Sequence, residues 1–79
     1  MYHVMWRAAA REEFELIGLD YPQAESQIAA ALDFIMFDLE FWPLRAGFPR
    51  SSSVHRMTYV EPLHIEYEVE DDKRVYIVA

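Results

Sequence analysis

Residues 63–70 alternate strictly between apolar and polar side chains, and no other segment constrains the fold of this chain as strongly. The two phases are Leu63, Ile65, Tyr67 and Val69 against His64, Glu66, Glu68 and Glu70. A period of two predicts a β-strand with one face on a core and the other in water. Turn residues 70–73 follow, and residues 74–79 are again β-branched and aromatic. We therefore expect a terminal hairpin with a row of carboxylates on its open face.

The rest of the chain predicts two helices and two further strands. Apolar residues recur at helical spacing in two segments, and Pro22 and Pro43 bound the second of them. The expected elements are strand 2–6, helix 7–19, helix 23–41, strand 54–60, strand 63–70 and strand 74–79. This order, β-α-α-β-β-β, predicts one α+β domain over residues 1–79, with both helices packed on one face of a mostly antiparallel sheet.

The second helix carries two apolar stripes. The first comprises Ala24, Ile28, Ala31, Ile35, Leu39 and Trp42, and the neighbouring one comprises Ala30, Phe34, Phe37 and Phe41. We expect the following residues in the core: Ile28, Ile35, Leu39, Ile65, Tyr67 and Val69. The core is also favoured for the aromatic cluster Phe34, Phe37, Phe41 and Trp42. Its alternative is a contact with a partner or a second copy, because this helix offers more apolar surface than one sheet face covers. Arg45 would lie beside such an interface.

Composition excludes several classes of function. The 79 residues hold 14 acids against 7 Lys and Arg, for a net charge of −7. Nucleic-acid binding depends on clustered cations, so intrinsic binding should be weak and a basic protein is the better partner. There is no cysteine for a disulfide or a thiolate metal site, and no cofactor is expected. No segment is predicted to cross a membrane or to act as a signal peptide, so we expect a cytoplasmic protein.

The positive charge that exists gathers in residues 45–56. Arg56 with His55 and Arg50 could hold a phosphate group and move a proton, as a catalytic site for phosphate chemistry requires. The favoured alternative is structural, with Arg56 paired to Glu66 or Glu68 on the facing strand. His64 and His3 are expected in solvent without a metal, since no second ligand stands at suitable spacing. Among the strand tyrosines, we expect Tyr67 in the core and Tyr59 and Tyr76 at the surface.

The chain resembles the RelE/ParE superfamily of toxins from bacterial type II toxin–antitoxin pairs. The resemblance extends over the whole chain and rests on these residues: Trp6, Ala9, Ala10 and Phe14; Leu39, Pro43 and Gly47; Arg56; the alternation 63–69; and Val75 with Ile77. It implies a cognate antitoxin as partner. Members act either as ribosome-dependent messenger RNA endoribonucleases or as inhibitors of DNA gyrase, so the ribosome and gyrase are the implied targets.

The resemblance leaves two main functions open. The family's nucleases use basic residues on the central strands and an Arg, His or Tyr near the C-terminus. Here Glu66, Glu68 and Glu70 stand on the third strand, and the chain ends at Ala79. We therefore expect a toxin-like component that acts mainly by binding protein, either a ParE-like inhibitor or a degenerate member. The alternative is a RelE-like endoribonuclease using Arg56, His55 and Arg50, and a third possibility is an antitoxin-like subunit.

Overall fold

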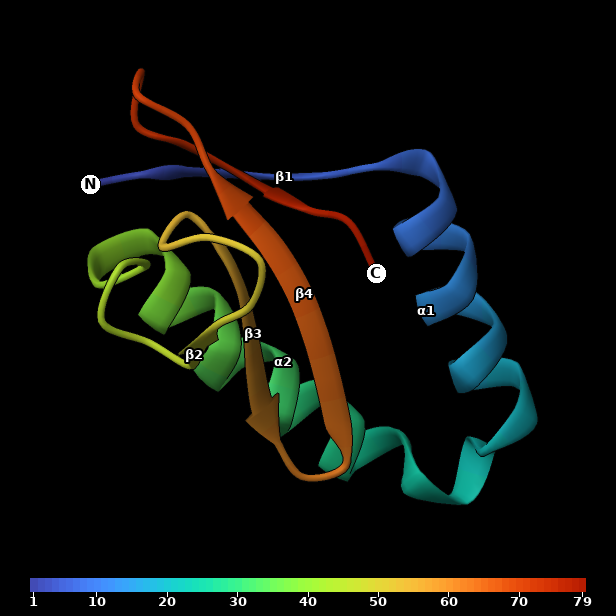
Figure 1. Cartoon of the computed structure of the whole chain (residues 1–79). Helices are drawn as coiled ribbons and strands as arrows, with labels where there is room; N and C mark the ends of the chain where they lie inside the picture. The colour runs from blue at the N-terminus through green and yellow to red at the C-terminus, as the bar shows by residue number, and fades with distance from the viewer.

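The alternating segment forms β4 (Leu63–Val69), the central strand of a five-stranded sheet, in a computed structural model that describes all 79 residues (Figure 1). The other elements are β1 (His3–Trp6), α1 (Ala8–Asp20), the short 3-10 helix η1 (Pro22–Ala24), α2 (Glu25–Phe41), β2 (Phe48–Pro49), β3 (His55–Val60) and β5 (Arg74–Ile77). The structure is thus an α+β fold with two helices, as the sequence predicted.

The sheet has the order β1-β5-β4-β3-β2. All neighbours are antiparallel except β1 and β5, which pair in parallel and bring the first and last strands of the chain side by side. The sheet is therefore mixed. The two-residue strand β2 pairs with β3 and lies within residues 44–53, the loop between α2 and β3, where no strand was expected. Two residues are too few to show a period of two, and proline is uncommon within strands, so no pattern in the sequence predicted β2.

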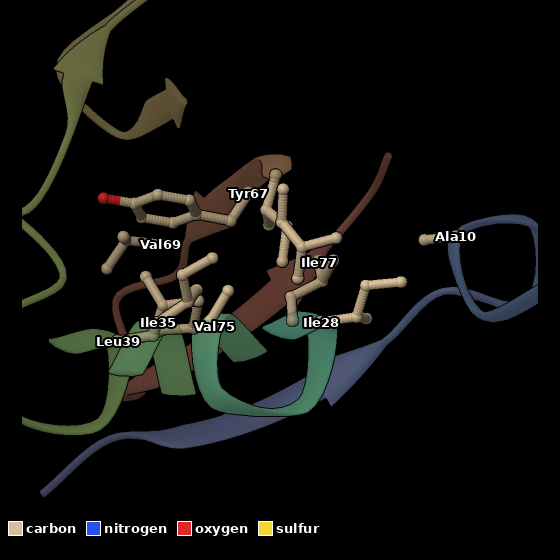
Figure 2. Close-up of a cluster of buried hydrophobic side chains, with 11 residues drawn as sticks. Ala10, Ile28, Ile35, Leu39, Tyr67, Val69, Val75 and Ile77 are labelled. Atoms are coloured by element: carbon tan, nitrogen blue, oxygen red, sulfur yellow. The ribbon is translucent and has the colours of Figure 1, made fainter. Parts of the chain in front are cut away.

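The core lies between α2 and one face of the sheet. The helix contributes Ile28, Ala31, Ile35 and Leu39, and the apolar phase of β4 and the residues Val75 and Ile77 of β5 face them (Figure 2). All six residues expected in the core are buried. The polar phase of β4 lies on the opposite face, so the predicted row of carboxylates on the open face is confirmed. Burying a side chain such as Ile35 or Leu39 contributes about 1.5–3 kcal/mol.

The first helix packs differently from the prediction. Only α2 covers the sheet, whereas α1 extends away beside it (Figure 1). Ala10 is the one buried residue of α1, and Phe14 is half-buried with its ring 5.4 Å from that of Trp6. The apolar stripe of α1 is short, so its spacing predicted a helix correctly but could not determine how much of the helix meets the sheet.

None of the helices combines the length and apolar character that crossing a membrane would require.

Candidate functional site

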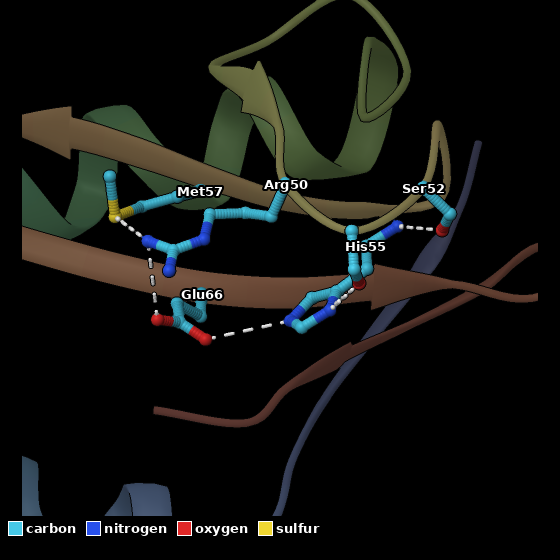
Figure 3. Close-up of polar contacts among 6 residues, drawn as sticks. Arg50, Ser52, His55, Met57 and Glu66 are labelled. Carbon is cyan, nitrogen blue, oxygen red and sulfur yellow. Dashed lines mark hydrogen bonds and ion pairs between the residues drawn. The ribbon is translucent and has the colours of Figure 1, made fainter.

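A polar cluster on the open face of the sheet unites Arg50, His55 and Glu66 (Figure 3). Arg50 follows β2, His55 opens β3, and Glu66 lies in the polar phase of β4. Glu66 occupies the centre, with one carboxylate oxygen 3.7 Å from Arg50 Nη1 and the other 3.5 Å from His55 Nε2. Arg50 Nη1 also lies 3.5 Å from the sulfur of Met57, the cross-strand neighbour of Glu66. The carboxylate thus offsets the charge of the most exposed cation in the cluster.

His55 is held through one ring nitrogen and through its backbone N–H. Its Nδ1 lies 2.8 Å from the hydroxyl of Ser51, and its backbone N–H donates to the hydroxyl of Ser52 at 3.1 Å. Nε2 is buried, makes no hydrogen bond and faces Glu66. The imidazole of His55 therefore lies between a hydroxyl that it contacts by a hydrogen bond and a carboxylate that it faces at 3.5 Å, an arrangement in which it could accept or release a proton.

Arg56 does not join this cluster. It is 8 % exposed and lies on the core side of β3, because neighbouring residues of a strand point to opposite faces. Its guanidinium donates to the backbone carbonyls of Ala46, Ser53 and Gly47 at 3.1, 3.2 and 3.4 Å respectively. The expected pairing of Arg56 with Glu66 or Glu68 was therefore wrong. The carbonyl oxygens that Arg56 meets come from the 44–53 loop, and no local pattern in the sequence indicates that this loop folds against the core side of β3.

Tyr67 reaches the same loop from the core. Its hydroxyl lies 2.7 Å from the carbonyl oxygen of Pro43 and 2.8 Å from that of Ala46, as expected for a core tyrosine with a backbone partner. Burial raises the pKa of Tyr67, and the neighbouring Arg56 opposes part of that rise. The two side chains together hold the loop that carries Arg50 to the open face.

The aromatic side chains of α2 define a second candidate site. The aromatic stripe, meaning Phe34, Phe37 and Phe41, is 61, 57 and 43 % exposed. Trp42, just beyond the helix, is 51 % exposed, and Arg45 lies over its ring at 5.7 Å. The favoured placement of this cluster in the core was therefore wrong. The prediction that α2 carries more apolar surface than the sheet covers is confirmed.

The stripe is exposed because of its position around the helix axis. Residues 34, 37 and 41 lie about 130° around the axis of α2 from the buried residues 28, 31, 35 and 39. Since α1 extends away beside the sheet, it leaves this side of α2 uncovered.

A groove of about 660 Å³ separates α1 from the first half of α2. Its walls include Phe14, Leu19, Ile28 and Leu32, and its two charged residues are Glu15 and Glu25. No Lys or Arg lines it. This groove and the aromatic stripe are on different sides of α2, and both are bordered by acids.

The remaining candidates are isolated residues. His64 is exposed and its ring meets that of Tyr59 edge-on at 4.5 Å, so it is the solvated cross-strand neighbour that the alternation predicted. His3 is exposed too, and no group of three or more His, Cys, Asp or Glu side chains is arranged to hold a metal ion. Tyr59 is exposed as expected, whereas Tyr76 is half-buried beneath the guanidinium of Arg7, 4.3 Å from its ring centre.

Glu66 was not predicted as the partner of Arg50 and His55. The alternation placed Glu66 on the open face, but which residues lie opposite it depends on the register between β3 and β4.

No family model, no curated protein and no solved structure matches this chain.

Proposed function

We propose that this chain is a cytoplasmic, toxin-like component of a type II toxin–antitoxin pair that acts mainly by binding protein. The observation that carries the proposal is the solvent-exposed aromatic stripe of α2. Phenylalanine is enriched in the cores of protein interfaces, and adjoining exposed apolar side chains commonly mark such sites. Phe37 and Phe41 lie with ring centres 4.7 Å apart, so a partner would meet a continuous apolar surface.

The state of the cations supports binding rather than catalysis. The guanidinium of Arg56 donates hydrogen bonds to backbone carbonyls, and the guanidinium of Arg50 is paired with the carboxylate of Glu66. A phosphate transition state needs preorganised cations that are free to meet it. The cations of this site are already engaged within the fold.

The resemblance to RelE/ParE toxins supplies the class of partner. On that basis, the chain binds a cognate antitoxin and acts on a large bacterial assembly, either DNA gyrase or the ribosome. An inhibitory role for the chain, ParE-like or degenerate, requires no bond to be cut by the chain itself.

Expression in bacteria tests the proposal. The chain is produced from an inducible promoter, alone and together with the product of each adjacent gene. We expect growth to stop when the chain is produced alone, and to recover with one neighbour that forms a complex of defined size with it. Normal growth together with the absence of any complex would overturn the proposal.

A matched pair of variants locates the interface. Phe34→Ser with Phe37→Ser should abolish that complex, whereas Leu16→Ser, which alters an equally exposed apolar residue of α1, should leave it intact. Circular dichroism of both variants checks that the fold is retained.

One observation favours a second function, ribosome-dependent cleavage of messenger RNA. Arg50 and His55 converge on the open face, and the imidazole of His55 lies between the hydroxyl of Ser51 and the carboxylate of Glu66, where it could act in proton transfer. This function uses two of the three predicted catalytic residues, while Arg56 would act only by supporting the loop.

A further inference from the structure

We infer that the aromatic stripe of α2 accepts a cationic amphipathic helix, with an apolar ridge between two rows of Lys or Arg. This inference rests on the proposed protein-binding function and specifies the chemistry of the partner.

The pattern of charge around α2 favours a cationic partner. Successive residues of a helix lie about 100° apart around the axis. On that spacing Asp33 and Glu40 border the stripe on one side and Asp38 borders it on the other. Helix α2 contains a further acid, Glu25, and no Lys or Arg. The apolar surface is therefore edged by carboxylates on both sides.

The position of these acids along the helix also favours a cationic partner. Asp38 and Glu40 lie at the C-terminal end of α2, where the helix dipole is negative, and no base occupies the last turn. Acids at such an end destabilise a helix, because their charge is repelled by the negative end of the helix dipole. Arg45, the nearest cation along the chain, lies over Trp42 rather than on the helix. Cations of a partner would relieve this repulsion.

The same charges argue against other occupants. A second copy of the chain, docked stripe to stripe, would bring two sets of carboxylates together at the edges of the contact. Nucleic acid and anionic lipid surfaces would be repelled for the same reason. Charge complementarity therefore selects a basic protein segment.

The shape of the surface selects a helix. Phe34, Phe37 and Phe41 form a ridge about 10 Å long along the axis of α2. Apolar anchors at spacings of three and four residues fit the ridges and grooves of another helix. Two to three turns of a partner helix would cover the ridge and bring its flanking cations to Asp33, Asp38 and Glu40.

Two synthetic peptides of about 14 residues provide the test. Both carry a Leu ridge, flanked by Lys on both sides in one peptide and by Glu in its twin. Each is titrated into the intact chain by calorimetry at low and at higher salt. We expect the Lys peptide to bind at least about tenfold more tightly than the Glu twin, with an affinity that falls as salt rises. Equal affinities would overturn the inference.

Charge-matched variants separate a specific site from general attraction to an acidic protein. Asp33→Asn with Asp38→Asn, and Glu12→Gln with Glu13→Gln on α1, each remove two negative charges. We expect the α2 pair to weaken binding of the Lys peptide at least about fivefold and the α1 pair less than about twofold. Equal losses would show attraction to net charge alone and would overturn the inference.

The apolar contribution has its own control. Phe34→Ser with Phe37→Ser should abolish binding of the Lys peptide, whereas Leu16→Ser should preserve it. Sedimentation of the free chain completes the test, because a dimer that these Phe variants dissociate would mean that a second copy occupies the stripe. If the partner from the growth experiment binds through an acidic or non-helical segment, this inference fails while the proposed function stands.

Discussion

At the scale of single residues, the 44–53 loop depends on a few backbone contacts. Gly47 adopts a φ of +62°, and a Cβ at this position would collide with the backbone carbonyl of Met57. Arg56 and Tyr67 then hold the loop through carbonyl oxygens on either side of this glycine. The sequence predicted either a catalytic role for Arg56 or a pairing with Glu66 or Glu68, whereas in the structure it donates to backbone carbonyls of this loop.

Substitution of the two glycines of the chain should have opposite effects. Gly47→Ala introduces both a collision and a strained φ, so we expect it to lower the free energy of unfolding by about 1–3 kcal/mol or more. Gly18 lies within α1 with open space around it, and Gly18→Ala should raise that free energy by about 0.5–1 kcal/mol. Urea denaturation of both variants measures the difference. Similar stability of the Gly47 variant and the unaltered chain would contradict the assigned loop conformation.

Tyr67 should make stability depend on alkaline pH. Its pKa is raised in the folded chain, so the unfolded chain loses the phenolic proton first as pH rises. The stabilisation is fully present below the unfolded pKa of about 10 and is lost as pH rises through the folded pKa.

Tyr67→Phe tests this dependence. Because the variant lacks the hydroxyl hydrogen bond, its free energy of unfolding at neutral pH should be lower by about 0.5–1.5 kcal/mol. Because it lacks the titrating phenol, its stability should fall less steeply above a pH of about 10. Denaturation series at several pH values give both quantities. An unchanged slope would mean that Tyr67 is not the group responsible.

At the scale of elements, adjacent residues of α2 face the core and the solvent. Ile35 is fully buried against the sheet, whereas its neighbour Phe34 faces solvent. One helix thus builds the core on one side and presents the aromatic stripe on the other. A helix that is apolar on both sides indicates a second contact beyond its own domain.

Adjacent substitutions in α2 should therefore differ sharply. Ile35→Ala leaves a cavity in the core and should lower the free energy of unfolding by about 2–5 kcal/mol. Phe34→Ala removes a largely exposed ring, so we expect a change within about 0.5 kcal/mol. Thermal and urea denaturation compare the two variants. A comparable loss in both would mean that Phe34 is packed within the chain.

At the scale of the whole molecule, net charge and the open face of the sheet set the limits on function. The charge of −7 opposes the approach of RNA, and Glu66 offsets Arg50 at the place where catalysis would need positive charge. Binding of a basic protein surface meets no such barrier.

The chain should accordingly leave messenger RNA intact. Purified protein is added to translating ribosomes, and the message is examined for cuts in the ribosomal A site. We expect no cutting. Cutting that Arg50→Ala and His55→Gln each abolish would replace the binding role with the nuclease. Arg56→Ala is a poor probe, because loss of its backbone contacts would disturb the loop regardless of chemistry.

The sequence by itself determined the two α-helices, four of the five strands and the face on which each residue of β4 lies. The alternation in β4 and the 3.6-residue spacing in α2 are local consequences of backbone geometry, so they identified all six core residues expected and the open carboxylate row. Tertiary structure alone decided three matters: the partners of Arg56, the union of Arg50 and His55 at Glu66, and the exposure of the aromatic stripe. The partners of Arg56 depend on the position of the 44–53 loop, and the meeting of Arg50 and His55 at Glu66 depends on the register between β3 and β4. The exposure of the aromatic stripe depends on the position of α1. Periodicity describes one segment at a time and contains no record of which other segment will cover it.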